Sequence, residues 1–365
     1  MESDNKGAEV GSGAEALRRQ IDETDERIVA LLNRRAQLAI DIGQLKHRSG
    51  GAIYRPDREA QVLAHAAAAG AGPLGPAAIR AIYAEVVSAC RALEREVRVG
   101  YLGPAGTFTH EAALRKFGAS ATLVPCATIE EVFRETERGN VDYGVIAVEN
   151  STAGSVTPTL EAFLESRLQV CAEMELPIVH NLMSRGVLGE IRRVYSHPQS
   201  LAQCRRWLAE HLAQAEQVAV ASNSLAVQMA ETPELAAIGP EAAGNLYGVP
   251  ILVRHIEDSS LNVTRFLVLG PARSPRTGRD KSAVVFSVKN RPGALRDALD
   301  IFARRGIDLT WIESRPSKRE LWQYVFFVDL IGHPEDETVA AALSELEQGA
   351  LFVKVLGAWP VESAA

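Results

Sequence analysis

The amino-acid sequence predicts a multidomain protein in which an all-helical segment is followed by an α/β domain and then by a smaller α+β domain. A chain of 365 residues is long enough for two or three domains. Near the N-terminus apolar residues recur at helical spacing, whereas from Arg98 onward short apolar strands alternate with helices. Beyond residue 282 the expected order is strand, helix, strand, strand, helix, strand. We expect a disordered tail (1–14), a helical domain (15–97), an α/β domain (98–272), a linker (273–281) and a C-terminal domain (282–365).

The first predicted element is a single long helix from Leu17 to Lys46. Arg35 lies on its apolar stripe, and Lys46 follows it by roughly 16 Å along the helix and about 20° around it. Because buried cations need partners, two cations on one seam are consistent with a dry site for a small dianion. The same pattern also fits cations that reach solvent from a coiled-coil seam or pair with acidic residues of a neighbouring helix.

Two further helices are expected, one beginning at Pro56 and one running from Pro76 to Glu96. With the long helix they resemble the all-helical chorismate mutases, because cations and an acid follow one another in that family's order. The matching residues are Arg18, Arg35, Lys46, Arg58 and Glu59. The resemblance implies that they surround chorismate, that Arg35 and Lys46 are catalytic, and that Arg18 comes from a partner chain. It also implies a catalytic role for Glu94, which stands where other members have Gln and could donate to the ether oxygen only when protonated.

Residues 98–272 are expected to form an α/β domain whose strands pair largely in parallel. Ligands in such sheets bind beyond the carboxyl ends of the strands, so the residues at those ends are informative. The expected strands are Val97–Leu102, Ala121–Pro125, Tyr143–Val148, Leu168–Val179, Arg193–Ser196, Val218–Ala221, Ala236–Gly239 and Val263–Gly270.

Four motifs lie at the ends of these strands. They are GPAGTFT at 103–109, ENSTAGSV at 149–156, SHPQSLAQ at 196–203 and NVTRF at 262–266. Each motif alone also fits a structural role, such as a turn, a helix cap or a surface ion pair. The first lacks the spacing of a nucleotide-binding loop, although a loop that opens a helix can still bind an anion. Together, and in this order, the four motifs resemble those of the prephenate dehydratases.

The resemblance to prephenate dehydratases implies two α/β lobes, as in periplasmic binding proteins, with the active site in the cleft between them. The reaction releases carbon dioxide and hydroxide while the ring becomes aromatic, so no cofactor is expected. Thr264 is implied to lie beside the leaving hydroxyl, with Arg265 as an anion partner. The other implied residues are Asn150, Ser196 and Gln203, which hold the substrate, and Glu149, which orients the hydroxyl network.

The C-terminal segment resembles the ACT regulatory domain, a ferredoxin-like α+β fold that binds amino acids at paired edges. Its motifs NRPGAL at 290–295 and ESRP at 313–316 match the form found behind prephenate dehydratases, where they bind phenylalanine. Gly293 opens a helix, so its turn offers N–H groups to a carboxylate. The alternative is an ordinary small α/β domain. The implied phenylalanine ligands are Asn290, Gly293, Ala294, Leu295, Glu313, Ser314 and Arg315.

Composition and charge argue against several other classes of protein. The formal net charge is −7 and no basic stripe alternates with aromatic residues, so nucleic acid is not an expected partner. No apolar run is long enough to span a bilayer, and the polar N-terminus does not resemble a signal peptide. The four cysteines are widely spaced, which favours free thiols in a reducing cytoplasm. No spacing of histidines or cysteines is typical of a metal site.

We interpret the sequence as an enzyme that converts chorismate to prephenate and prephenate to phenylpyruvate, is inhibited by phenylalanine, and forms a homodimer or larger homo-oligomer. One alternative is a dehydratase whose helical segment is only a dimerisation arm. The cations on the helical seam argue against it, because an inert arm does not need them. A second alternative is a non-catalytic ligand-binding protein, since two-lobed folds also serve for capture alone. The TRF motif at 264–266 beside Glu149 and Asn150 argues for chemistry.

Overall fold

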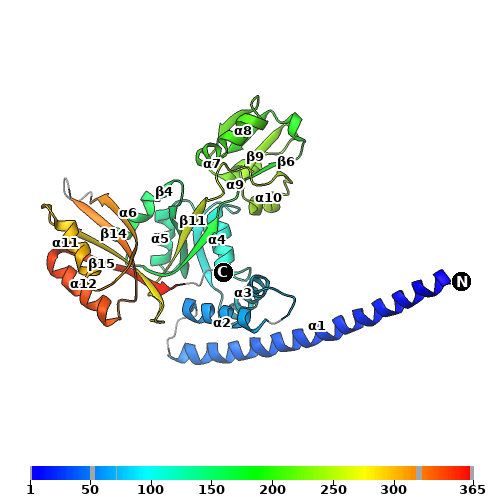
Figure 1. Ribbon diagram of the computed structural model, residues 1–365, viewed down its shortest axis with the longest axis horizontal. Helices are drawn as coiled ribbons and strands as arrows, with labels where there is room; N and C mark the ends of the chain where they lie inside the picture. The colour runs from blue at the N-terminus through cyan, green and yellow to red at the C-terminus, as the bar shows by residue number, and fades with distance from the viewer. Residues whose placement is uncertain (1, 50–53, 71, 318–322, 362–365) are drawn as a thin grey trace.

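The structure is a computed structural model of the chain. It describes all residues except 1, 50–53, 71, 318–322 and 362–365, and for residues 2–12 and 46–49 it describes the backbone alone. Figure 1 shows a long helical arm that carries the N-terminus, a central body with a second lobe above it, and a C-terminal domain at the opposite side from the arm.

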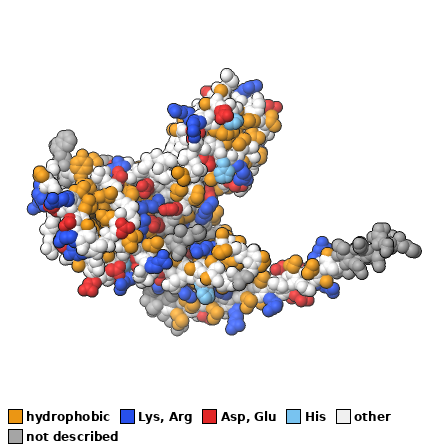
Figure 2. Space-filling view, in the orientation of Figure 1, with side chains coloured by type: hydrophobic (Ala, Val, Ile, Leu, Met, Phe, Trp, Pro, Cys, Tyr) orange, Lys and Arg blue, Asp and Glu red, His pale blue; other side chains and the backbone are white. Residues whose placement is uncertain are grey.

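Three helices form the N-terminal region: α1 (Glu2–Ser49), α2 (Pro56–Ala69) and α3 (Pro76–Glu94). Helix α1 is longer than predicted, and residues 2–14, for which we predicted a disordered tail, are helical. Their glycines weaken a helix without terminating it. Helix α3 packs against both α1 and α2, but the apolar stripe of α1 is not covered within this chain. Leu17, Ile21, Leu31 and Leu38 are each more than half exposed, and Figure 2 shows hydrophobic and charged side chains side by side along the arm.

The central body is built on β1 (Arg98–Leu102), β2 (Thr122–Cys126), β3 (Tyr143–Asn150), β5 (Gln169–Pro177) and β11 (Val263–Gly270), and β3 also pairs with the short β4 (Gly154–Ser155). Strand β1 is parallel to β2 and β3, whereas β11 runs antiparallel between β3 and β5. The helices α4 (Phe108–Phe117), α5 (Ile129–Glu137) and α6 (Thr157–Glu165) connect these strands. The sheet is therefore mixed, and the prediction of largely parallel pairing fails at β11, because the chain returns to the sheet there from a second lobe.

The second lobe lies between β5 and β11 in the sequence. Its sheet has the order β10-β6-β9-β7-β8, in which β7 pairs in parallel with β8 and β9. The strands are β6 (Asn181–Ser184), β7 (Arg193–Ser196), β8 (Glu216–Ala219), β9 (Leu235–Gly239) and β10 (Ile251–Val253). The helices are the 3-10 turn Leu188–Glu190, α7 (Pro198–Gln203), α8 (Arg205–His211), α9 (Asn223–Met229) and α10 (Glu241–Tyr247). Strands β6 and β10, of four and three residues, were not predicted.

The C-terminal domain has the predicted element order. Its elements are β12 (Asp280–Val288), α11 (Ala294–Ala303), β13 (Leu309–Pro316), β14 (Tyr324–Ile331), α12 (Glu337–Gly349) and β15 (Ala350–Pro360). The strands have the order β13-β14-β12-β15, and β15 pairs with β5, so this sheet continues the sheet of the central body. The pairing brings Gly357 against Val170, where a Cβ on Gly357 would lie 2.2 Å from the Val170 carbonyl oxygen. A glycine is therefore required at this junction.

Candidate active sites and regulatory site

A cleft of about 420 Å³ separates the central body from the second lobe and brings together residues of all four motifs. The central body contributes the start of α4, the end of β3 and the start of β11, whereas the second lobe contributes α7 and the loop before β6. Among the polar residues that line the cleft are Asn150, His180, His197, Gln203, Asn223 and Thr264. The predicted residues Asn150, Gln203 and Thr264 therefore share one site.

Asn150 fixes the orientation of the Thr264 hydroxyl. The Oδ1 atom of Asn150 accepts hydrogen bonds from the Thr152 hydroxyl at 2.7 Å and from the Ala153 N–H at 2.9 Å, so the other end of the amide is its NH₂ group. That group donates to Thr264 Oγ1 at 2.8 Å and to Asn262 Oδ1 at 2.8 Å. Thr264 Oγ1 accepts this hydrogen bond from Asn150, so the hydroxyl proton of Thr264 points elsewhere. No described residue accepts that proton. Thr264 is thus prepared to donate a hydrogen bond into the cleft.

Gln203 connects the two lobes by hydrogen bonds. Its Nε2 atom donates to the Thr152 hydroxyl at 2.7 Å, and its Oε1 atom accepts from Asn262 Nδ2 at 3.1 Å. His180 Nε2 lies 2.8 Å from the same oxygen, so this ring nitrogen carries the hydrogen. His180 is 1% exposed, and its burial lowers its pKa, which favours the neutral ring. A continuous chain of hydrogen bonds therefore runs from His180 to Thr264.

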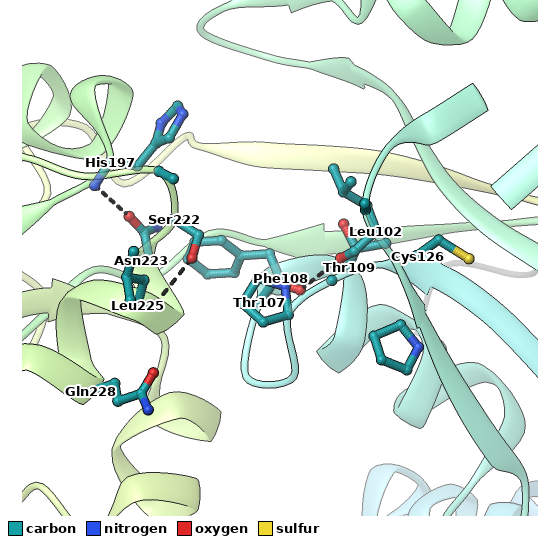
Figure 3. Close-up of a pocket in the computed structure, with 15 residues that line it drawn as sticks. Leu102, Thr107, Phe108, Thr109, Cys126, His197, Ser222, Asn223, Leu225 and Gln228 are labelled. Carbon is teal, nitrogen blue, oxygen red and sulfur yellow. Dashed lines mark hydrogen bonds between the residues drawn. The ribbon is translucent and has the colours of Figure 1, made fainter. Parts of the chain in front are cut away.

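Ser196 lies behind the cleft surface instead of on it. It is fully buried in β7, where its hydroxyl is 3.0 Å from Asn223 Oδ1 and 2.9 Å from the Ile238 carbonyl oxygen. Asn223 Oδ1 also accepts from the His197 N–H at 3.0 Å, a contact visible in Figure 3. Ser196 thus holds in place the Asn223 side chain that lines the cleft.

The glycine-rich motif at 103–109 forms the wall of the cleft on the side of the central body. The Thr107 hydroxyl accepts from the His110 N–H at 3.2 Å and so caps α4, which directs Phe108 and Thr109 toward the second lobe. A second cavity, shown in Figure 3, shares the lining residues Phe108, Thr109, His197 and Asn223 with the cleft. The motif therefore contributes wall residues to two neighbouring cavities.

Glu149 and Arg265 do not line the cleft, contrary to their predicted roles. Each is the immediate neighbour of a cleft residue on a strand, and successive side chains on a strand point to opposite faces. Arg265 lies directly opposite Glu149 across β11 and β3. On that far face Arg265 forms an ion pair with Asp329 of the C-terminal domain, with Nη1 and Oδ2 2.6 Å apart. In this structure Arg265 therefore lies away from the cleft, which the predicted anion partner of the substrate would have to face.

The helical region has a separate cavity of about 410 Å³ lined by Arg35, Arg58, Glu59 and Glu94. Glu94 packs against α1, because a Cβ added to Gly43 would lie 3.0 Å from Glu94 Cγ. The other three come from α1 and the start of α2, and Glu59 forms an ion pair with the buried Arg91 of α3.

Two further residues predicted for this cavity are not among those that line it. Arg18 is exposed on the distant part of α1, and the side chain of Lys46 lies outside the described residues. Arg55, which stands where some chorismate mutases have an acid, forms an ion pair with Asp57 at 2.6 Å.

The residues predicted to bind phenylalanine fall into two separate groups. Gly293 adopts a left-handed conformation, with φ of 80°, at the start of α11, next to Asn290, Ala294 and Leu295. The other group lies on β13, where Arg315 and Glu313 pair at 3.2 Å. Strand β14 separates β13 from β12, so the two groups are roughly two strand spacings, or about 10 Å, apart across the sheet. One chain alone does not bring them together.

Several residues that line the cleft or belong to its hydrogen-bond network were not predicted as site residues. Thr152 and Asn262 belong to the ENSTAGSV and NVTRF motifs, so their position in the sequence offered a signal. His180 precedes β6 without a motif, and its contact with Gln203 depends on how the loop before β6 packs against α7 within the second lobe. In the part of the chain that the structure describes, no cluster of His, Cys, Asp and Glu side chains could hold a metal ion. None of the helices, over the same residues, is both long and apolar enough to cross a membrane.

Comparison with protein families gives three matches that follow one another along the chain. Residues 17–95 match chorismate mutase type II, residues 99–274 match prephenate dehydratase, and residues 282–348 match the ACT domain. The bifunctional chorismate mutase/prephenate dehydratase of Aquifex aeolicus is 45% identical over 350 residues, which cover 94% of this chain and 97% of that protein.

Solved structures match the part of the chain beyond the helices. The prephenate dehydratase of Arthrobacter aurescens, solved in complex with L-Phe, has a TM-score of 0.67 and 34% identity, covering 74% of this chain and 92% of that one. The prephenate dehydratase of Staphylococcus aureus has a TM-score of 0.65 and 29% identity, covering 72% of this chain and all of that one.

Proposed function

The chain belongs to the family of bifunctional chorismate mutase/prephenate dehydratases, and on this premise we propose which residues carry its two reactions and its regulation. The enzyme rearranges chorismate to prephenate and then converts prephenate to phenylpyruvate. We assign the first reaction to the cavity of the helical region and the second to the cleft between the two α/β lobes. We propose that the two lobes are arranged as in periplasmic binding proteins, and that the C-terminal domain is ferredoxin-like, since its elements follow the order strand, helix, strand, strand, helix, strand.

The proposed dehydratase mechanism depends on the direction of the hydrogen bond between Asn150 and Thr264. As the bond to the ring carboxylate breaks, its electrons move into the ring and the ring hydroxyl departs. The departing oxygen takes up a proton and leaves as water, the ring carboxylate leaves as carbon dioxide, and phenylpyruvate is the aromatic product. Because the Thr264 hydroxyl already accepts from Asn150, its proton is available for the departing oxygen. Gln203 and Asn223 face the same cleft and are proposed to bind the polar groups of prephenate.

The assignment of Thr264 is tested by its replacement with Ala, with Thr264→Ser as the matched variant that keeps the hydroxyl. The phenylpyruvate formed from prephenate should be lost in the first variant and largely kept in the second. Equal rates in the two variants would contradict the assignment.

The proposed mutase site combines cations and acids from two chains. Arg35, Arg58, Glu59 and Glu94 line the cavity of one chain, and Lys46 is proposed as a further ligand from α1. Arg18 precedes Arg35 by seventeen residues, roughly 25 Å along the helix, so it cannot reach its own chain's cavity. A second copy packed on the exposed apolar stripe of α1 would cover that stripe and could supply its Arg18. We therefore propose that the enzyme is at least a homodimer.

Phenylalanine is proposed as the effector of the C-terminal domain. The support is the ACT match at 282–348 and the structural likeness to a prephenate dehydratase in complex with L-Phe. Because the two groups of predicted ligands are apart in one chain, we propose that a second copy's domain completes each site, as at paired edges of ACT domains. The exposed side chains of β13, such as Ile312, leave that edge available for pairing. A cytoplasmic location is proposed from the four cysteines, which are all free and buried.

A further inference from the structure

Four charged side chains are buried between the dehydratase body and the C-terminal domain. We call Glu173, Arg265, Lys281 and Asp329 the interdomain ion cluster. Two of these side chains are cationic and two are anionic, and their exposed fractions are 16%, 10%, 13% and 1% in the order given. Ion pairs this far from solvent are screened little by salt, and removing one partner strands the other.

The contacts within the interdomain ion cluster join both domains. Glu173 and Arg265 belong to β5 and β11 of the body, whereas Lys281 and Asp329 belong to β12 and β14 of the C-terminal domain. Arg265 Nη1 lies 2.6 Å from Asp329 Oδ2, and Lys281 Nζ lies 3.2 Å from Glu173 Oε2. Lys281 Nζ is also 3.8 Å from Asp329 Oδ2. Each domain thus contributes one anion and one cation, and both strong pairs cross the boundary.

One member of the cluster is the direct chain neighbour of the proposed catalytic residue. Thr264 faces Asn150 in the cleft, and Arg265 points to the opposite face of the same strand. A displacement of the Arg265 backbone must therefore be shared by Thr264. Since the Thr264 hydroxyl has to face a departing oxygen, a shift of about an ångström would be enough to slow the reaction.

On the other side, the cluster touches the strand that carries one group of proposed effector ligands. The Arg265 guanidinium lies over the ring of Trp311, 5.1 Å from its centre. Trp311 is opposite Asp329 in the pairing of β13 with β14. It shares one face of β13 with Glu313, because the exposed Ile312 lies between them. Movement of Glu313 on ligand binding would therefore reach Trp311 and Asp329 directly.

Arg265 is only partly satisfied in this arrangement. Its Nε and Nη2 atoms are buried and have no hydrogen-bond partner among the described residues. Glu149, directly opposite on β3, offers a carboxylate within the body itself. Arg265 therefore has anionic neighbours in both domains. They are Asp329 in the C-terminal domain and Glu149 and Glu173 in the body. Alternative partners in two domains are expected of an element with two arrangements.

We propose that Arg265 is a positioning residue through which Asp329 and the effector strand β13 control the placement of Thr264. The inference rests on the proposed phenylalanine regulation of this enzyme. An effector that displaces β13 and β14 weakens the Arg265–Asp329 pair, β11 shifts, and Thr264 loses its alignment with the substrate.

The test is Asp329→Asn in the full-length enzyme, with Glu335→Gln as the control that removes an exposed carboxylate of the same domain. Rates of phenylpyruvate formation are measured against phenylalanine concentration, and phenylalanine binding is measured by calorimetry. In Asp329→Asn we expect phenylalanine still to bind while the rates with and without it agree within about two-fold. Glu335→Gln should be inhibited like the wild type. Inhibition of Asp329→Asn equal to that of the wild type would overturn the proposal.

Asp329→Asn leaves the buried charge of Arg265 without its partner, so this single variant could fail to fold. The double variant Arg265→Gln/Asp329→Asn removes both charges together and is measured in the same way. A measurement on the unaltered protein gives a further check: phenylalanine should change the hydrogen exchange of residues 263–270. Inhibition without any change there would also overturn the proposal. If the wild type neither binds phenylalanine nor is inhibited by it, the proposed regulation itself is wrong. That outcome differs from a wild type that is inhibited without the involvement of Arg265 and Asp329, which contradicts only the present proposal.

Discussion

Asn150 donates a hydrogen bond to Thr264 and does not accept one from it, with Nδ2 and Oγ1 2.8 Å apart. The direction follows from the donors that occupy Asn150 Oδ1. A threonine hydroxyl is a weak acid, so its contribution to the reaction depends on the direction in which its proton points. The Asn150–Thr264 bond makes that proton available to the substrate, and this relationship yields the first prediction.

Asn150→Asp should lower the turnover of prephenate by about 100-fold while changing the size of the side chain very little. A carboxylate accepts hydrogen bonds, so it would draw the Thr264 proton to itself and away from the departing oxygen. The measurement is the rate of phenylpyruvate formation at saturating prephenate. Asn245→Asp, at an exposed position of α10, is the matched control. Turnover of Asn150→Asp within a few-fold of the wild type would show that the direction of this bond is unimportant.

His180 should make the folded dehydratase lose stability as the pH falls. Burial lowers the pKa of His180 in the folded state, so the unfolded chain binds a proton more readily, at a pKa of about 6.5. The contribution is therefore complete above that value and decreases as the pH falls toward the lower folded-state pKa. Urea unfolding at pH 7.5 and pH 5.5 should show a smaller loss in His180→Gln than in the wild type. An unchanged loss would mean that His180 is not held neutral, and His65→Gln serves as a control at an exposed histidine.

Glu94 is expected to act on chorismate as a hydrogen-bond donor or as a positioned polar group, which its amide analogue can replace. Glu94→Gln should therefore keep mutase activity, whereas Glu94→Ala should lower it by about 100-fold. Chorismate consumption is the measurement. Gly43→Ala should also reduce the activity, because the new methyl group would lie 3.0 Å from Glu94 Cγ and displace it. Equal losses in the Gln and Ala variants would remove Glu94 from the reaction.

Mixed dimers should reveal whether one mutase site uses two chains. Arg18→Ala and Arg35→Ala should each be nearly inactive as pure proteins. In a dimer of the two, one site carries both changes and the other carries neither. Random pairing after refolding of an equal mixture should restore about a quarter of the wild-type sites. If native mass spectrometry detects the mixed dimers and no activity returns, each site is built within one chain.

The sequence predicted much of this site because its motifs lie at strand ends, where chain order and geometry agree. Strands β7 and β11 have the predicted bounds, and Asn150, Gln203 and Thr264 meet in one cleft. Strand periodicity implies that Thr264 and Arg265 face opposite sides of β11. The interpretation of the NVTRF motif nevertheless placed both side chains at the substrate. Which face the C-terminal domain covers depends on the β15–β5 junction, and that contact has no local signal.

Two other features depend on contacts that a single sequence does not display. His180 gains its role only when the fold of the second lobe brings it to Gln203, 23 residues further along the chain. The apolar stripe of α1 was expected to be buried. The apolar residues do follow helical spacing, but within one chain their side chains are exposed. Periodicity shows that a face needs a partner without showing which chain supplies it.

The central claim is that two separate sites act in sequence and that Thr264 serves only the second. The most direct measurement supplies chorismate to the Thr264→Ala enzyme and follows prephenate and phenylpyruvate together over time. We predict that chorismate disappears at the wild-type rate, that prephenate accumulates, and that the rate of phenylpyruvate formation falls by at least about 100-fold. Formation of phenylpyruvate at a rate near that of the wild type would contradict the account, and so would a parallel loss of chorismate consumption.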